Sequence, residues 1–220
     1  MKILLTGATG YIGKRVLPLL IQKGHHVICC VRDKSRFNPP ESLKNNISIV
    51  EADLLNKESI SSLPNDIDVA YYLVHSMSSS ENYKKLEKES AENFRERISQ
   101  TDVKQVIYLS GIVNEENLSK HLLSRKAVEL ELEKGEYNLT TFRAGIIVGS
   151  GSASFEIIRD LIEKLPMMIT PKWLLTKCQP IGVSDVVKFL TEALLKKEVY
   201  NKNFDIGSND VLTYKQMLLK

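Results

Sequence analysis

The chain has 220 residues, 43% of them hydrophobic, with 30 Lys and Arg against 27 Asp and Glu. Charges this evenly balanced argue against a nucleic-acid or membrane-surface protein, because such a protein carries a clustered basic excess. No run of about 18 apolar residues occurs, so no membrane span is expected, and the length suits one compact domain.

Short apolar runs alternate with helical patterns along the chain. Strands are predicted at 2–7, 26–31, 47–53, 69–75, 105–111, 139–149 and 203–207, and helices at 13–24, 80–100, 118–134, 154–164 and 183–196. The strands are nearly all apolar, which predicts a parallel sheet covered by helices on both faces. Right-handed crossovers then give an α/β fold, a doubly wound parallel sheet of the Rossmann type with about seven strands in the order 3-2-1-4-5-6-7.

The first predicted strand leads into the glycine-rich turn "TGATGYIG" (6–13). Glycines between a strand and a helix allow a tight turn and a close approach of the backbone to a pyrophosphate. Such a turn can also exist without a ligand, but its place inside a βαβ unit favours a dinucleotide site. The residues of the turn expected to contact the cofactor are Gly7, Thr9, Gly10, Tyr11, Ile12 and Gly13.

This turn resembles the Thr-Gly-x-x-Gly-x-x-Gly loop of extended and atypical short-chain dehydrogenases/reductases. The stretches "YYLVHSM", "HLLSRKAVE", "FRAGIIVGSGSASFE" and "TKCQPIGVSDV" are similar to the atypical NAD(P)-binding subgroup called nucleoside-diphosphate-sugar epimerase-like, or NmrA-like. The resemblance extends over nearly the whole chain. It implies one NAD(P)-binding Rossmann domain over 1–220, with 150–182 and 205–220 as a minimal substrate-side lobe toward the C-terminus.

The resemblance also implies roles for residues outside the glycine turn. Asp53, in "EADLLN", should reach the adenine amino group, and Ser110, in "YLSG", stands at the position of the family's catalytic serine. The exit of the fourth strand lines the cofactor in this family. Further cofactor contacts are expected from Leu54, Leu73, Val74 and Ala144.

The residue after the second strand indicates which dinucleotide binds. Arg32 follows "HVICCV", and its planar guanidinium suits the 2′-phosphate of NADP because it can bind two phosphate oxygens. Lys34 and Arg36 add positive charge nearby. The alternative is that Asp33 still reaches the ribose hydroxyls, as an acidic residue does in NAD-binding proteins. The sequence favours NADP(H) over NAD(H).

The Tyr-x-x-x-Lys pair that active members of this superfamily use is absent. None of the eight tyrosines is followed four places later by Lys. The stretch "HLLSRKAVE" has His121 at the position of the tyrosine and Arg125 at that of the lysine, on one helical face. Arg125 can still hydrogen-bond a nicotinamide ribose, although it cannot give up a proton.

Three interpretations follow from this replacement. His121 can substitute as general acid, because histidine titrates near neutrality. The site can instead bind nucleotide without turnover, as a redox sensor or scaffold does. In the third interpretation another donor acts, such as His75 at the exit of the fourth strand.

The expected protein is an NADP-dependent oxidoreductase acting on an unknown carbonyl or alcohol, with the non-catalytic NADP(H)-binding protein as the alternative. Its expected partners are the dinucleotide and a small-molecule substrate, with no nucleic acid and no membrane. It is expected to be a monomer or homodimer. The number of cysteines is odd, at three, which predicts a reducing, cytoplasmic setting. The histidines and cysteines do not have the spacing of metal ligands, so no metal is expected.

Overall fold

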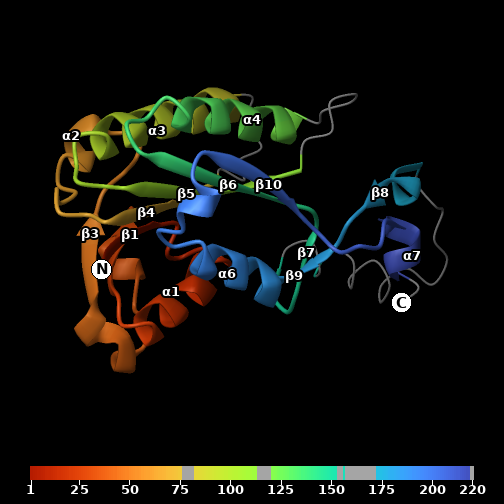
Figure 1. Ribbon diagram of the computed structural model, residues 1–220, viewed down its shortest axis with the longest axis horizontal. Coiled ribbons are helices and arrows are strands. Elements are labelled where there is room, and N and C mark those ends of the chain that lie inside the picture. The colour runs from red at the N-terminus through yellow and green to blue at the C-terminus, as the bar shows by residue number, and fades with distance from the viewer. Residues whose placement is uncertain (76–81, 113–119, 153–155, 157–171, 219–220) are drawn as a thin grey trace.

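The computed structural model describes residues 1–75, 82–112, 120–152, 156 and 172–218. Its centre is a seven-stranded sheet in the order β10-β6-β5-β4-β1-β2-β3, with every neighbouring pair parallel. The strands are β1 (Lys2–Thr6), β2 (His26–Val31), β3 (Ile47–Glu51), β4 (Val69–Tyr72), β5 (Gln105–Gly111), β6 (Asn138–Ala144) and β10 (Lys202–Ile206). With β10 as the seventh strand, this is the predicted order, and the doubly wound Rossmann-type fold is confirmed (Figure 1).

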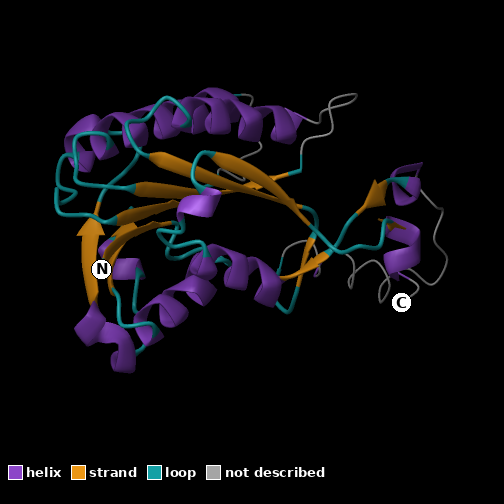
Figure 2. Ribbon diagram, viewed as in Figure 1, coloured by secondary structure: helices purple, strands orange, loops and turns teal. Residues whose placement is uncertain are grey.

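Helices cover both faces of the sheet, as Figure 2 shows. α1 (Gly13–Gln22) and α6 (Val183–Glu192) lie on one face, and α2 (Lys57–Ile60), α3 (Tyr83–Ile98) and α4 (Lys120–Leu132) lie on the other. Side chains alternate along each strand, so β5 sends Ile107 and Leu109 to the first face and Val106 and Tyr108 to the second. Two hydrophobic cores result, one on each side of the sheet.

Beyond the carboxyl ends of the strands the chain forms smaller elements. β7 (Ile147–Val148) pairs in parallel with β9 (Ile181–Gly182), and β8 (Lys177–Cys178) pairs antiparallel with β11 (Leu212–Thr213). The 3-10 helix η3 (Lys172–Leu175) and α7 (Tyr214–Leu218) pack beside the second pair (Figure 1). Apart from residue 156, the predicted helix 154–164 of this lobe lies outside the described residues, and the lobe's role toward a substrate stays a prediction. The other 3-10 helices are η1 (Lys34–Arg36), η2 (Glu41–Asn46) and η4 (Lys197–Val199).

The prediction of one strand over 139–149 is wrong, because β6 ends at Ala144 and β7 begins separately at Ile147. Gly145 stands at the break. A Cβ atom on Gly145 would lie 2.0 Å from the carbonyl oxygen of Gln179, so another segment crosses the backbone closely there. The N–H of Gly145 also donates to the carbonyl of Ile206 at 3.2 Å. These contacts join residues far apart in the sequence, so an apolar run cannot reveal them.

A buried ion pair fastens α4 to the sheet. Glu129 on α4 is fully buried, and its carboxylate accepts hydrogen bonds from Arg143 of β6, from Nε at 3.0 Å and from Nη2 at 2.5 Å. Lys126 Nζ donates to the same carboxylate at 2.7 Å. Burial alone would raise the pKa of Glu129, but the hydrogen bonds from Arg143 and Lys126 outweigh it and lower the pKa. The charged pair sets the position of α4 beside β6.

We predict that Glu129→Gln lowers the free energy of unfolding by about 3 kcal/mol at neutral pH, because the partly buried Arg143 loses its counter-charge. A carboxyl whose pKa is lowered by folding stabilises the protein above its unfolded pKa, and this contribution is lost as pH falls through the folded value. The gap between wild type and variant should therefore narrow below about pH 4.3. Urea unfolding across this pH range measures both effects.

The control for this prediction is Glu133→Gln, which removes the same charge at an exposed position just after α4. That substitution should change the free energy of unfolding by less than about 0.5 kcal/mol. An equal loss in the two variants would show that the buried ion pair is not what holds α4.

Candidate functional site

The turn between β1 and α1 is built by close contacts that only glycine permits. Gly7 has a φ of +72°, and a Cβ atom on it would lie 2.5 Å from the carbonyl oxygen of Leu73. A Cβ atom on Gly13 would lie 2.2 Å from the carbonyl oxygen of Gly7. The N–H of Gly10 closes the turn on that same oxygen at 2.9 Å. Gly7 and Gly13 therefore bring β1, the end of β4 and the start of α1 together.

Gly10 is exposed and less closely packed than Gly7 and Gly13. Within 4 Å of a Cβ atom built on Gly10 lies only the Gly7 carbonyl oxygen, at 3.1 Å. Among the described residues, the N–H groups of Tyr11, Ile12 and Gly13 have no hydrogen-bond acceptor, and no side chain caps α1. Free N–H groups at the start of a helix, beside a position without a side chain, suit the pyrophosphate of a dinucleotide.

Contacts of Arg15 and Tyr11 that were not predicted from the sequence join this turn to the loop after β7. We call this set of contacts the Arg15 clasp. The guanidinium of Arg15 lies 3.8 Å above the ring of Tyr11 and donates to the carbonyls of Tyr11 at 3.1 Å and Ser150 at 2.7 Å. A Cβ atom on Gly149 would lie 2.7 Å from the Tyr11 hydroxyl. The four-residue spacing of Tyr11 and Arg15 was visible in the sequence, but their partner loop lies more than a hundred residues away.

At the end of β2, the two charged side chains differ in what they contact. Arg32 is exposed, and its guanidinium has no partner among the described residues. The Asp33 carboxylate accepts hydrogen bonds from the N–H of Ser35 at 2.9 Å and from its hydroxyl at 2.6 Å. These hydrogen bonds lower the pKa of Asp33 and turn its carboxylate into the first turn of η1. Of the two charged side chains at the end of β2, Arg32 is therefore the one whose polar atoms have no partner among the described residues.

The end of β3 brings the predicted adenine contact beside β2. The Asp53 carboxylate accepts from the N–H of Leu55 at 3.0 Å, and the Asp53 N–H donates to the Ser59 hydroxyl at 2.9 Å. Burial raises the pKa of the nearby Cys30 thiol to about 12, and the negative charge of Asp53 contributes a smaller part of this rise. Of the other predicted cofactor contacts, Thr9 is exposed, Leu54 and Leu73 are buried, Val74 is half-buried, and Ala144 is buried in the core on the α1 and α6 side.

Three of the predicted catalytic residues gather at the carboxyl ends of β4 and β5. Ser110 is buried, and its hydroxyl has no hydrogen-bond partner among the described residues. Arg125 of α4 lies over Gly111, where a Cβ atom would be 3.5 Å from Cδ and 3.7 Å from Nη1 of the arginine. His75, just after β4, is near enough to Arg125 for that charge to act on its imidazole. A buried hydroxyl without a partner is rare in folded proteins, which suits a site that a ligand completes.

The protonation of this cluster follows from its surroundings. The His75 side chain is exposed to solvent, yet crowding by protein atoms removes part of its hydration, and this desolvation and the Arg125 charge lower its pKa. His75 is therefore neutral at pH 7. The Tyr108 hydroxyl donates to the Arg125 carbonyl at 3.3 Å. It also lies close enough to the Ser110 hydroxyl for that group to act against the rise of its pKa. Burial raises the pKa of Tyr108 to about 12, so this tyrosine holds α4 rather than exchanging protons.

His121 lies on α4 one turn before Arg125, and its side chain falls outside what the structure describes. Its role as an acid stays a prediction. In the described part of the chain, no three His, Cys, Asp or Glu side chains gather in a way that could hold a metal ion. No helix within those ranges combines the length and apolar character that crossing a bilayer requires.

The chain is similar to several curated proteins, of which two are described here by name. Divinyl chlorophyllide a 8-vinyl-reductase, chloroplastic, of Arabidopsis thaliana is 25% identical over 94% of this chain and 53% of its own length. The photosystem II assembly factor Ycf39 of Trieres chinensis is 24% identical over 94% of this chain and 64% of its own length. The chain thus spans between half and two thirds of the length of these relatives.

Solved structures share the fold at low identity. UDP-glucose 4-epimerase of Thermotoga maritima matches with a TM-score of 0.79 and 20% identity, over 100% of this chain and 81% of that one. An epimerase of Methanothermobacter thermautotrophicus matches with a TM-score of 0.80 and 17% identity, over 99% of this chain and 74% of that one. The model of a family described as NAD(P)H-binding matches residues 7–141, which include the glycine turn, Arg32, Asp53 and Arg125. As the resemblance to atypical short-chain dehydrogenases/reductases implied, the chain belongs to this NAD(P)H-binding family.

Proposed function

We propose that the protein is an NADP(H)-dependent oxidoreductase acting on a carbonyl or alcohol. The observation that carries the proposal is the meeting of Ser110, Arg125 and His75 at the edge of the sheet where the glycine turn lies. In a doubly wound sheet, ligands bind outside the carboxyl ends of the strands. The buried Ser110 hydroxyl lacks a partner and could donate a hydrogen bond to a substrate oxygen in that space.

The residues have separable roles in this proposal. A bound nicotinamide would supply or accept the hydride. Arg125 would hold a ribose hydroxyl through its fixed N–H donors and keep a positive charge beside the reacting oxygen. His121 or His75 would hold or pass the proton that balances the hydride. Because the lowered pKa leaves His75 uncharged at pH 7, His75 suits a hydrogen-bonding role better than that of a cationic acid.

The preference for NADP(H) rests on Arg32 and Asp33. The Asp33 carboxylate is occupied by Ser35, whereas Arg32 has no partner among the described residues. An unpaired guanidinium at the end of the second strand suits a 2′-phosphate, and a carboxylate at that place would repel one.

A second candidate function is a non-catalytic NADP(H)-binding sensor or scaffold. The observation that favours it is the replacement of the Tyr-x-x-x-Lys pair by His121 and Arg125. The names of the curated relatives support both candidates, since one is called a reductase and the other an assembly factor. A cytoplasmic location stays a prediction.

We predict that Gly10→Ala weakens NADPH binding at least tenfold, because a methyl group would stand where the backbone approaches the phosphates, while stability falls by less than about 1 kcal/mol. Gly13→Ala is the matched variant, since its methyl group would meet the Gly7 carbonyl oxygen at 2.2 Å. That variant should lose about 3 kcal/mol of stability or more. Fluorescence titration and thermal unfolding test both. Unchanged NADPH affinity in folded Gly10→Ala would exclude the turn as the phosphate site.

We predict that Arg32→Ala raises the Kd for NADPH about tenfold to a hundredfold, through the loss of charge-assisted hydrogen bonds to the 2′-phosphate. The Kd for NADH should change less than about twofold, since NADH lacks that phosphate. Lys44→Ala, which removes an exposed charge in η2, is the control and should leave both constants unchanged. If NADPH binds Arg32→Ala as tightly as wild type, Arg32 does not contact the phosphate.

The decisive experiment for the proposed function follows deuteride transfer from 4-deuterated NADPH to a panel of aldehydes and ketones. Wild type should transfer the label to at least one of them. His121→Ala should lower kcat about a hundredfold or more, the contribution of a positioned acid, with NADPH affinity unchanged. Equal rates in wild type and variant would remove His121 from the mechanism. Tight NADPH binding without transfer to any panel member would favour the sensor or scaffold.

A further inference from the structure

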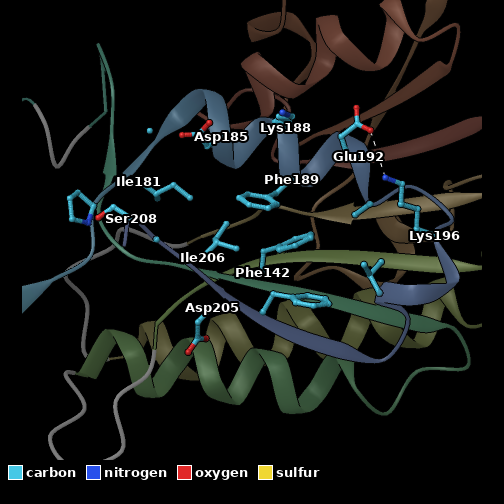
Figure 3. Close-up of a pocket in the computed structure, with 16 residues that line it drawn as sticks. Phe142, Ile181, Asp185, Lys188, Phe189, Glu192, Lys196, Asp205, Ile206 and Ser208 are labelled. Atoms are coloured by element: carbon cyan, nitrogen blue, oxygen red, sulfur yellow. Dashed lines mark ion pairs between the residues drawn. The ribbon is translucent and has the colours of Figure 1, made fainter. Parts of the chain in front are cut away.

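Two features lie beside α6 on this face of the sheet. One is a groove of about 790 Å³ between α6 and β10, lined by aromatic rings and bordered by charged side chains of α6 (Figure 3). The other is the loop at 149–152, which packs against Val183 at the start of α6 and which the Arg15 clasp joins to the glycine turn. The groove shares no residue with the clasp. Of the two features, the clasp is the one that contacts the proposed phosphate site.

The clasp supplies a donor to a carbonyl that α1 leaves free. In a regular α-helix the N–H of Arg15 would donate to the carbonyl of Tyr11, four residues earlier. Here that N–H donates to the Ile12 carbonyl at 2.9 Å, and within the described part of the chain no backbone N–H reaches the Tyr11 carbonyl. The side chain of Arg15 takes its place, because Nη1 donates to the Tyr11 carbonyl at 3.1 Å.

This hydrogen bond also fixes one N–H group of the proposed phosphate site. The Tyr11 carbonyl and the Ile12 N–H belong to the same peptide group, which is planar and trans, so they point in opposite directions. The Ile12 N–H has no acceptor among the residues that the structure describes. While Arg15 holds the carbonyl, the N–H is held facing the other way. If this peptide group turned over, it would present a carbonyl oxygen to the anion and repel it.

The loop after β7 holds the Arg15 side chain in this position. The guanidinium lies 3.8 Å above the Tyr11 ring, and Nη2 donates to the Ser150 carbonyl at 2.7 Å. The loop is folded on itself, since the N–H of Ser152 donates to the Gly149 carbonyl at 3.0 Å. One ring and two carbonyls therefore set the place of the guanidinium. A planar fork of N–H donors suits this arrangement, whereas a lysine ammonium is a point charge on a flexible stem.

We propose that Arg15 is a positioning residue for the dinucleotide, which orients the Ile12 N–H toward the pyrophosphate and couples that orientation to the loop at 149–152. The inference rests on the dinucleotide site of the proposed function and adds a residue that acts without contacting the cofactor. Arg15 acts through the peptide group between Tyr11 and Ile12. A cation that acted only by its charge could be replaced by any other cation, but the clasp requires the fork.

Titration of the full chain with NADPH and with NADH tests this role. Arg15→Ala should raise both Kd values about tenfold and by the same factor, because both dinucleotides carry the pyrophosphate. Arg15→Lys keeps the charge but not the fork, and should still raise both values at least about fivefold. Lys14→Ala removes the exposed neighbouring charge, leaves the clasp intact and should change both values less than about twofold. Thermal unfolding verifies that each variant is folded.

Gly149→Ala tests the part that the loop plays. The added methyl group would lie 2.7 Å from the Tyr11 hydroxyl and 2.6 Å from Cγ1 of Val183, so the loop must move and carry the Ser150 carbonyl away from Arg15. This variant should raise both Kd values at least about threefold. Adding it to Arg15→Ala should raise them less than about twofold further, because contacts that act together are not additive.

The possible failures can be told apart. Full affinity in Arg15→Lys would show that charge acts rather than the clasp, and would overturn the proposal. An unchanged Kd in Arg15→Ala would overturn it as well, while weaker binding by Gly10→Ala would still support the phosphate site. Fully additive losses in the double variant would overturn the coupling to the loop. If wild type binds neither dinucleotide, the proposed function fails and this inference fails with it.

Discussion

The rest of the structure depends on two backbone contacts at the first turn. The Leu73 carbonyl at the end of β4 and the start of α1 both approach Gly7 so closely that no side chain fits at Gly7 or Gly13. This packing fixes α1 against the sheet and leaves the first N–H groups of α1 without acceptors in the described structure. Those N–H groups point to the edge of the sheet where β4 and β5 also end. The contacts that pack α1 on the sheet therefore also leave free the N–H groups that the proposed phosphate site requires.

The second half of the site depends on how α4 is held. Glu129 binds Arg143 of β6, and the Tyr108 hydroxyl of β5 donates to the Arg125 carbonyl. One contact holds the backbone of Arg125 itself, and the other holds Glu129, one helical turn later. Together they keep the Arg125 side chain over Gly111. Buried charge of this kind contributes little net stability but is strongly destabilising when one partner is removed. It is suited to fixing a helix in one position, which a site that orients a cofactor and a substrate oxygen requires.

The sheet order and the strand-to-helix turn at the glycines could be predicted from sequence, because the alternation of strands and helices and the spacing of the glycines are both visible along the chain. The break of the sixth strand at Gly145 could not, since its cause is the Gln179 carbonyl on a distant segment. The clasp from Arg15 to Ser150 was missed for the same reason. The open edge beside β10 follows from the strand order, but its aromatic and charged character appears only once α6 is placed on the sheet.

The charge of Arg125 shows why a histidine is not equivalent to a tyrosine in this site. A nearby cation lowers the pKa of any neighbouring acid. For a tyrosine this makes the neutral hydroxyl a better proton donor near pH 7. For a histidine it disfavours the imidazolium, and at His75 the Arg125 charge adds to desolvation, the larger cause of the lowered pKa. A histidine acid here therefore needs a compensating negative charge, and the phosphates of a bound dinucleotide would supply one. Proton transfer in this protein would then depend on the cofactor being bound, whereas the ribose-holding role of Arg125 needs no such compensation and suits a sensor equally well.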